Sequence, residues 1–432
     1  MNRISAFSST ALACMACTGD TRAPEYDGTA GFLDGGGFID AGILRADPRD
    51  AAASKDSAWA TEASSRSSDT GVRDDGGDAT TSVPHAEVFV YVGGWATPYP
   101  FQTYRLELAR GTLTLLGTTT EFGSNPSYLS ASADGRFLYI ADEDYSGNAG
   151  VTVGSVDSGN ELPSEIQKQP LPGNSSVVFT SIDPRGKYLL AADYNGGKAV
   201  VYGINENGRL SAEVDREMFD PGAHTHCIRV HPSGKWAYVT NKDSNMIAQY
   251  SFGADGKLAP LSPPGVKGHQ GPRTIAFHPS MNFVYVSDEY TSEVVAYRVN
   301  TDGTLAEVDS ESTLPNGFSG MNTGAHVMVH PGGTWIYASN RGDDSIARFA
   351  IAPDGTMSFV DRAPTLGKNP RHFDIDPAGK VLVVANQGTS GMSDGSVVSF
   401  MIDGSGSLVP TTTAISSLQE PTVAAIVSRA GF

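Results

Sequence analysis

From about residue 85 onward, apolar and polar residues alternate in short runs that end at turn residues. Six stretches share one pattern: an alternating segment, a turn rich in Pro and Gly, and a second alternating segment that ends in Asp or Asn. They read SYLSASADGRFLYIADE, VFTSIDPRGKYLLAADY, HCIRVHPSGKWAYVTNK, RTIAFHPSMNFVYVSDE, AHVMVHPGGTWIYASNR and RHFDIDPAGKVLVVANQ. Alternation with a period of two predicts β-strands with one buried face. Because Pro presets φ and Gly accepts positive φ, each intervening segment predicts a tight turn.

The repeat predicts a closed ring of sheets. Each copy continues with a third strand, a Gly-containing turn and a fourth strand, and successive copies begin 46 to 52 residues apart, which is the spacing of propeller blades. Residues 88–94 open a further blade that lacks its innermost strand, and residues 421–427 supply such a strand at the C-terminus. We therefore expect an all-β, seven-bladed β-propeller whose first blade is completed by the C-terminal strand. Closure of this kind removes exposed sheet edges.

The N-terminal region has a different character. Residues 1–17 hold one Arg followed by small and apolar residues, as in a short bacterial signal sequence, and Cys14 and Cys17 each end a segment similar to a lipoprotein processing site. Residues 18–84 are rich in Gly, Ser, Ala, Thr and Asp, a composition that buries too little apolar surface to offset its ordering entropy. We expect a leader at 1–17, a disordered tether at 18–84 and the propeller at 85–432. Export to the periplasm or cell surface, with lipid attachment through Cys14 or Cys17, is the corresponding prediction.

Charge and cysteine content narrow the classes of partner. The formal net charge is −18, which disfavours nucleic acid and anionic membrane surfaces. The three cysteines form neither a disulfide framework nor a zinc motif. His224 and His226 alternate on one strand and could share a metal, but no further ligand is evident, and His269 lies in a connection without an assigned role. We expect a monomer without metal or cofactor, attached to a membrane only through an N-terminal lipid.

Two positions of the repeat carry the candidate chemistry. The first opens the first strand of each copy and holds Ser127, Val178, His226, Arg273, Ala325 and Arg371. The second follows the Asp or Asn that ends the second strand and holds Glu143, Tyr194, Lys242, Glu289, Arg341 and Gln387. Their constant separation of 16 residues predicts two adjacent rings around one mouth of the channel, with His326 and His372 one residue further along. A mixed cluster with a cationic excess is typical of a site for an anionic or oxyanion-forming small molecule. Ion pairs that only fix the packing of the blades would give the same pattern.

Three segments carry a family resemblance. GPRTIAFHPSMNFVYVSDEY, GAHVMVHPGGTWIYASNRG and NPRHFDIDPAGKVLVVANQ resemble successive blades of the lactonase propellers, which include propeller-type 6-phosphogluconolactonases and a muconate cycloisomerase. The likeness spans about residues 86–428. It implies a site of His226, Arg273, Glu289 and Arg341, to which the last blade adds Arg371 and Gln387. His326 and Met328 replace an acid and a His that the family often has in its sixth blade, and Gly-Gly-Trp replaces Gly-Thr-Tyr in the first.

The resemblance implies hydrolysis of a lactone ring, on a sugar-derived or anionic lactone. This reaction needs a base that activates water and positive charge where the carbonyl oxygen becomes an oxyanion. Glu289 or His226 is the expected base, and Arg273 and Arg341 are expected to stabilise the oxyanion. The expected substrate-binding residues are Arg371, Gln387, His326, His372, Lys242 and Glu143. Two alternatives stay open: a non-catalytic exported propeller that binds a ligand or acts as a scaffold, and a cycloisomerase for a dicarboxylic acid.

Overall fold

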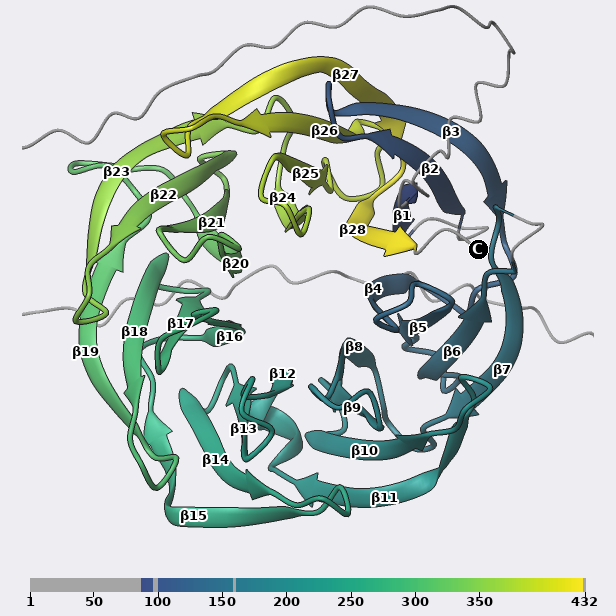
Figure 1. Cartoon of the computed structure of the whole chain (residues 1–432), viewed down its shortest axis with the longest axis vertical. Helices are drawn as coiled ribbons and strands as arrows, with labels where there is room; N and C mark the ends of the chain where they lie inside the picture. Colours follow the sequence, from purple (N-terminus) through teal and green to yellow (C-terminus); the bar gives the residue numbers. More distant parts are fainter. Residues whose placement is uncertain (1–86, 96–99, 158–160, 430–432) are drawn as a thin grey trace, which may run out of the picture. The chain divides into compact units, whose positions relative to one another are not determined.

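The computed structural model describes residues 87–95, 100–157 and 161–429. Within this part, seven four-stranded antiparallel sheets surround a central axis (Figure 1), so the predicted seven-bladed β-propeller is confirmed. The predicted leader at 1–17 and tether at 18–84, with Cys14 and Cys17, lie outside the described residues. The described part has a single helical turn, η1 (Pro221–Ala223), and no helix there is long and apolar enough to cross a membrane.

The first blade joins the two ends of the described chain. From the axis outward it contains β28 (Pro421–Arg429), β1 (Glu87–Gly94), β2 (Phe101–Glu107) and β3 (Thr112–Thr119). β28 pairs with β1 in antiparallel register, with Phe89 opposite Val427. The predicted closure of the ring by a C-terminal strand is therefore confirmed.

The other six blades follow one another along the chain, each built from four consecutive strands. The second blade contains β4 (Pro126–Ala131), β5 (Phe137–Asp142), β6 (Gly150–Ser155) and β7 (Ser164–Pro170). The third contains β8 (Val177–Ile182), β9 (Tyr188–Asp193), β10 (Lys198–Ile204) and β11 (Leu210–Met218). The fourth contains β12 (Thr225–Val230), β13 (Trp236–Asn241), β14 (Met246–Phe252) and β15 (Leu258–Lys267).

The remaining three blades complete the circle back to β28. The fifth contains β16 (Pro272–Phe277), β17 (Phe283–Asp288), β18 (Glu293–Val299) and β19 (Leu305–Ser312). The sixth contains β20 (Thr323–Val329), β21 (Trp335–Arg341), β22 (Ser345–Ile351) and β23 (Met357–Pro364). The seventh contains β24 (Pro370–Ile375), β25 (Val381–Asn386), β26 (Gly395–Ile402) and β27 (Leu408–Leu418).

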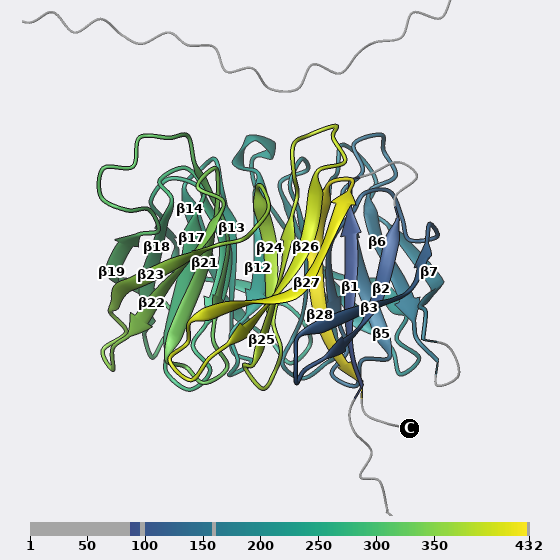
Figure 2. The same ribbon diagram turned by 90° about the horizontal axis from the view of Figure 1, so that it is seen from above.

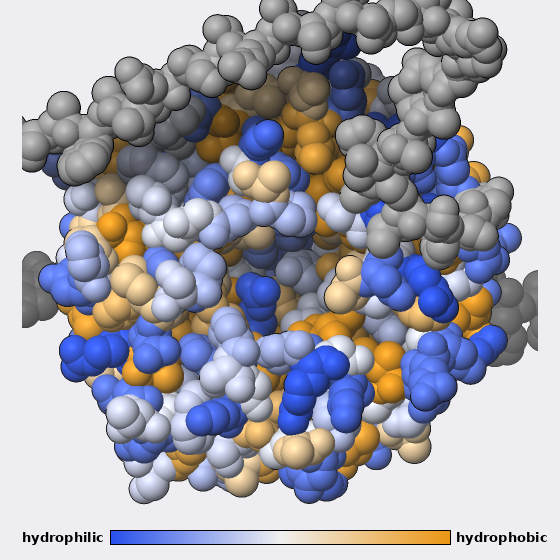
Figure 3. Space-filling model, in the orientation of Figure 1, coloured by the Kyte–Doolittle hydropathy of each residue, from blue (hydrophilic) through white to orange (hydrophobic). Residues whose placement is uncertain are grey.

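The apolar core lies between the blades. The second strands β17 and β25 are buried along their whole length, because each blade packs between two neighbours and both of its faces meet apolar side chains. The outermost strands lie at the rim, and β23 is largely exposed. Figure 2 shows the strands running between the two ends of the propeller, where the connections lie. Figure 3 shows one end, where hydrophilic and hydrophobic residues surround a central hollow.

A repeated contact joins the blades at five of the seven interfaces between them. An aromatic ring at the start of a second strand packs on the glycine of the turn between the third and fourth strands of the following blade. The pairs are Phe137 with Gly208, Tyr188 with Gly256, Trp236 with Gly303, Phe283 with Gly355, and Trp335 with Gly406. In four of these pairs a Tyr two residues after the aromatic ring donates its hydroxyl hydrogen to the carbonyl of that glycine. The pairs therefore link each blade from the second to the sixth to the blade that follows it.

The contact between Trp236 and Gly303 allows a test of this coupling. Gly303 has a φ of 86°, and a Cβ there would lie 2.3 Å from Trp236 Cδ2. We expect Gly303→Ala to lower the free energy of unfolding by about 2–4 kcal/mol, because overpacking adds to the cost of a left-handed backbone. Gly234 is the matched control, since it has a φ of 71° with nothing near its Cβ position. Equal losses of stability in urea titrations of Gly303→Ala and Gly234→Ala would contradict the interblade role.

Candidate active site

The first of the two predicted rings is formed by residues at β-bulges. Register shifts in the pairing of first and second strands leave out Ser127, Val178, His226, Arg273 and Arg371, and in the sixth blade both Ala325 and His326. A bulge re-aims the side chain of the unpaired residue. In the first blade the pairing of β28 with β1 skips Thr422 in the same way. Thr422 is therefore the seventh member of the first ring, which the gap-free sequence repeat does not reveal.

The two rings meet at one cavity of about 150 Å³. The lining residues are Trp95, Glu143, Tyr145, Val178, Tyr194, His226, Lys242, Arg273, Glu289, Arg341 and Arg371. Seven of the ten predicted site residues are among them, including all four of the predicted catalytic group. Trp95 directly follows β1 and is the seventh member of the second ring. The structure thus brings together residues from all seven blades.

Glu289 lies at the centre of a cluster of cations. Its Oε2 atom lies 2.9 Å from Arg273 Nε and 3.2 Å from Arg341 Nη2, and its Oε1 atom lies 3.6 Å from Lys242 Nζ. Burial alone would raise the pKa of the carboxyl group, but the surrounding cations outweigh burial and lower that pKa to about 2. Glu289 is therefore an anion at every physiological pH, and both of its oxygens are engaged.

Backbone carbonyls fix the two guanidinium groups that share Glu289. Arg273 Nη1 donates to the carbonyl of Ala325 at 2.6 Å, and Arg341 Nη2 donates to the carbonyl of Gly324 at 2.9 Å. Both carbonyls belong to the start of β20, on the blade next to Arg273. A guanidinium group has five N–H donors, so each arginine keeps donors for a ligand after these contacts. The Nε of Arg341 is buried and has no hydrogen-bond partner among the described residues.

A second group of side chains, around Glu143, also lines the cavity. Glu143 accepts hydrogen bonds from Trp95 Nε1 at 3.1 Å and from the Tyr145 hydroxyl at 2.5 Å. The Arg371 guanidinium stacks on the Trp95 ring at 4.2 Å from its centroid and meets Glu143 Oε2 only at 3.8 Å. Arg371 is thus held by longer contacts than Arg273 and is better able to turn toward an anionic ligand.

His226 is the buried imidazole of the cavity. Its side chain packs edge-on against the Tyr194 ring, with centroids 5.9 Å apart, and its Nδ1 atom has no hydrogen-bond partner in the described part of the chain. Burial, followed by the nearby arginines and Lys242, lowers the pKa of His226 well below 6.5. His226 is therefore neutral near pH 7, and the tautomer with its proton on Nε2 presents Nδ1 as an acceptor.

A polar chain continues from the cavity to its rim. Lys242 contacts the Tyr290 hydroxyl, which donates to Asp243 Oδ1 at 2.5 Å, and Asp243 also contacts His224 Nδ1. The His224 ring stacks on Tyr194 at 4.2 Å between centroids. The His224 and His226 side chains thus contact the same tyrosine, one stacked and the other edge-on, and His224 is paired with a carboxylate.

Three predicted substrate-binding residues lie away from this cavity. His326 and His372 line a deeper space of about 20 Å³ together with Tyr128, and their rings pack against each other at 4.4 Å between centroids. Burial lowers the pKa of His372 to about 3 and that of His326 well below 6.5, so both imidazoles are neutral near pH 7. The space that they line shares His226, Arg273 and Arg371 with the cavity. Gln387 is buried and follows β25, but among the described residues it is not one of those that line either space.

Several site residues were missed by the sequence reasoning. The aromatic residues Trp95, Tyr145, Tyr194 and Tyr290 form walls and rim of the cavity, and Tyr194 was noticed only as a ring position. Trp95 carries a signal, because Gly-Gly-Trp ends the second strand of the first blade as the ring pattern requires. Tyr145 comes from a loop that is longer in the second blade than in the third to fifth blades, so the repeat does not align it, whereas Tyr290 directly follows the ring position Glu289 and could have been found from the repeat.

Comparison with known proteins decides the family. The family model described as "Lactonase, 7-bladed beta-propeller" matches residues 89–426. The chain belongs to this family. Its resemblance to the lactonase propellers is therefore confirmed, and the protein is a lactonase-type propeller.

Relatives in this family carry lactonase names. The 6-phosphogluconolactonase of Bacillus subtilis (strain 168) is 31% identical over 278 residues, which cover 62% of this chain and 79% of that protein. The 6-phosphogluconolactonase of Erwinia tasmaniensis is 29% identical over 295 residues, which cover 68% of this chain and 86% of that protein. A crystal structure of a candidate 6-phosphogluconolactonase from Bacteroides fragilis NCTC 9343 superposes with a TM-score of 0.71 at 26% identity, over 81% of this chain and all of that chain. The periplasmic gluconolactonase of Pseudomonas aeruginosa has the same fold, with a TM-score of 0.71 at 23% identity over 79% of this chain and 99% of that chain.

Proposed function

We propose that this lactonase-type propeller hydrolyses a small, hydroxylated lactone to the corresponding hydroxy acid. One observation carries the proposal: a neutral imidazole with an unpartnered nitrogen and two guanidinium groups fixed by one carboxylate line the same cavity. Base and positive charge are the two requirements of lactone hydrolysis. The names of the relatives from Bacillus subtilis and Erwinia tasmaniensis support the same reaction class.

His226 is the base in this proposal. A general base needs a free acceptor atom in the site; His226 lines the cavity, and its Nδ1 atom has no hydrogen-bond partner among the described residues. Glu289 is less suited, because its oxygens are engaged by three cations and its pKa is about 2. Its role is to hold Arg273 and Arg341 in place and to offset their charge.

The reaction then proceeds in two steps. His226 accepts a proton from water while the water oxygen bonds to the lactone carbonyl carbon, and the carbonyl oxygen becomes an oxyanion held by Arg273 and Arg341. In the second step the oxyanion collapses, the bond between the carbonyl carbon and the ring oxygen breaks, and His226 returns its proton to that oxygen. The guanidinium groups suit this task because they stay charged and donate in a fixed fork.

The cavity limits the class of substrate. Its volume of about 150 Å³ is below the ~300–1,000 Å³ of drug-sized ligand sites, so it suits a single small ring. Trp95, Tyr145 and Tyr194 offer aromatic faces for the C–H groups of a sugar ring. The four cations Arg273, Arg341, Arg371 and Lys242 outnumber the two carboxylates Glu143 and Glu289, which favours a ligand that is anionic or becomes so on hydrolysis.

A lactone panel tests the proposal. Proton release from D-glucono-1,5-lactone, its 6-phosphate and the unhydroxylated δ-valerolactone is followed at pH 6.5 with and without the purified protein. We expect the hydroxylated lactones to open faster than in buffer alone, and the phosphate arm decides whether a phosphoryl group adds to binding. The proposal fails if no lactone opens faster than in buffer. Lactone formation from cis,cis-muconate would instead assign a cycloisomerase.

The neutral state of His226 predicts the pH profile. Because the pKa of this imidazole lies well below 6.5, the base form is already complete at pH 6, and lowering the pH from 8 to 6 does not protonate it. We expect kcat/KM for lactone opening, corrected for the spontaneous reaction, to be constant within about twofold between pH 6 and 8. An acidic limb centred near pH 6.5 would show that an unperturbed histidine is the base.

A further inference from the structure

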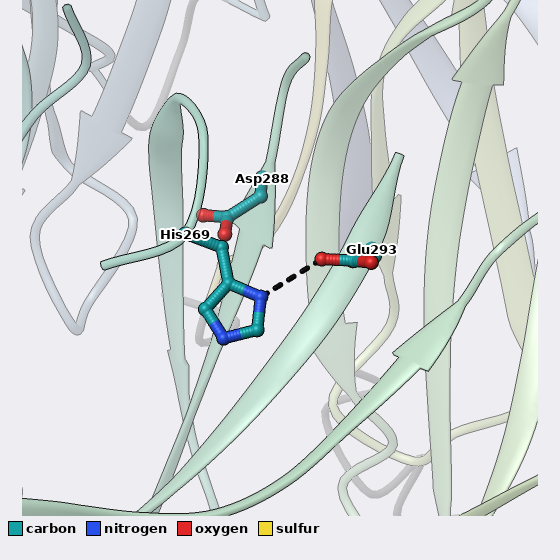
Figure 4. Close-up of side chains that lie close together, drawn as sticks. All are labelled: His269, Asp288 and Glu293. Atoms are coloured by element: carbon teal, nitrogen blue, oxygen red, sulfur yellow. Dashed lines mark hydrogen bonds and ion pairs between the residues drawn. The ribbon is translucent and has the colours of Figure 1, made fainter. Parts of the chain in front are cut away.

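A cluster of metal-ligating side chains lies at the edge of the fifth blade, outside the cavity. His269 precedes β16, Asp288 ends β17 and Glu293 begins β18 (Figure 4). One potential ligand atom of each lies within 4.8 Å of those of the other two. His269 Nδ1 lies 2.9 Å from Glu293 Oε2, and its Nε2 lies 3.2 Å from Oε1 of Glu307 on β19. Three carboxylates therefore surround one imidazole.

Asp288 is buried without compensation. It is 1% exposed, and neither oxygen of its carboxylate receives a hydrogen bond of good geometry, although the backbone N–H of His269 faces it. The residues at the same position in other blades have at least one bonded side-chain atom: Asn340 donates to the carbonyl of Thr313, Asn386 donates to the carbonyl of Thr365, and Asp142 accepts from the Thr152 hydroxyl. Because an unpartnered buried carboxylate is costly, a cation bound beside Asp288 would stabilise its charged form.

In the third blade a lysine of the same blade supplies such a cation. There the strand-end residue is Asp193, and Lys198, five residues later, lies 3.1 Å from its Oδ2 atom. Five residues after Asp288 stands Glu293, which adds a second negative charge where the third blade has a positive one. The fifth blade therefore has no counterpart of Lys198 at that position.

His269 occupies a position that is glycine in three other blades. Nineteen residues before the strand-end Asp or Asn, the second, fourth and seventh blades have Gly123, Gly222 and Gly367. A Cβ at Gly123 or Gly367 would collide with the strand-end side chain, at 1.6 and 2.4 Å. His269 is thus a departure from the repeat, directed at the same carboxylate group that Glu293 approaches.

We propose that His269, Asp288 and Glu293 bind one divalent metal ion of the zinc type, with Glu307 or water as a fourth ligand. One imidazole nitrogen with carboxylate oxygens is a ligand set that Zn²⁺ accepts. The side chains of His269 and Glu293 are about 30% and 28% exposed, which leaves a path for the ion. Asp288 is adjacent to Glu289, and the backbone N–H of Glu289 donates to the carbonyl of Gly271 at 2.7 Å. The ion would fasten the segment that positions Arg273 and Glu289, independently of which lactone is the substrate.

Zinc titration of the full chain, stripped with a chelator, tests the site by calorimetry and by thermal unfolding. We expect the wild type to bind one more Zn²⁺ per chain than Glu293→Lys, and its Tm to rise with Zn²⁺ until the site is saturated. Glu293→Lys copies the third blade, so its metal-free Tm should exceed that of the metal-free wild type and should not respond to Zn²⁺. Glu311→Gln, which removes a charge from the same strand as Glu307, should bind as the wild type does.

The difference in Zn²⁺ binding between the wild type and the variants distinguishes this site from other zinc-binding residues of the chain. Cys14, Cys17 and His85 are present in every variant, so Zn²⁺ bound there cancels in the difference. If Glu293→Lys does not fold, His269→Asn replaces it and should weaken Zn²⁺ binding at least tenfold. Equal stoichiometry and equal Tm response in the wild type and the variants would overturn the proposal and leave the cluster as an ion pair of protonated His269.

Discussion

Replacing Arg273 by Met is expected to lower kcat for lactone opening by about 10²–10³-fold, the usual loss when one donor to an oxyanion is removed. Met has nearly the length of the Arg stem, so the change removes the guanidinium charge and its donors from the cavity with little loss of packing. The contact with Glu289 at 2.9 Å and the hydrogen bond to Ala325 disappear with it. KM should change less than kcat, because the interaction with the oxyanion exists only in the transition state.

A second arginine provides the control for this experiment. Arg348 is also buried, also pairs with a carboxylate, Asp361 at 2.6 Å, and also donates to a backbone carbonyl, that of Ser405. It belongs to β22 and does not line the cavity. Arg348→Met should lower stability in the same way as Arg273→Met but leave kcat within about twofold, since it touches no developing charge. Equal losses of kcat in the two variants would mean that Arg273 acts only through the fold.

Replacing His226 by Phe is expected to lower kcat by about 10²–10⁴-fold, the range found when a general base is removed. Phe keeps the edge-on contact with Tyr194 but has no nitrogen to accept the proton of water. His330→Phe is the control, because His330 lies at a turn and contacts the carbonyl of Gly379 through Nε2, away from the cavity.

Glu289→Gln decides between the two bases that the sequence allowed. If His226 is the base, Glu289→Gln should lower kcat only to the extent that Arg273 and Arg341 lose the carboxylate that positions them. A His226→Phe variant that keeps wild-type kcat, beside a Glu289→Gln variant without activity, would assign the base to Glu289 instead. Thermal unfolding must accompany both measurements, since removal of Glu289 leaves three cations near one another without their counter-ion.

The rings of candidate residues were predictable because the repeat has no gaps. A constant offset of 16 residues between His226 and Lys242, or between Arg273 and Glu289, requires that both members lie at the same end of a blade. The antiparallel pairing of first and second strands is the physical origin of that offset. The same logic failed for His326, which follows Ala325 in the bulge of β20 and faces the deeper space. It could not place Gln387, because position in a ring does not determine where a side chain points.

The sequence alone determined the number of blades, the closure of the ring by residues 421–427 and the charged residues at one end of the central channel. It could do so because strand alternation, turn residues and repeat length are local properties. The tertiary structure alone decided how those charges pair. It placed Arg273 and Arg341 on one carboxylate oxygen and left His226 neutral with a free nitrogen. It also brought Thr422 into the first ring from a blade that the repeat does not cover. These features depend on burial and on contacts between blades, which arise only when the ring has closed.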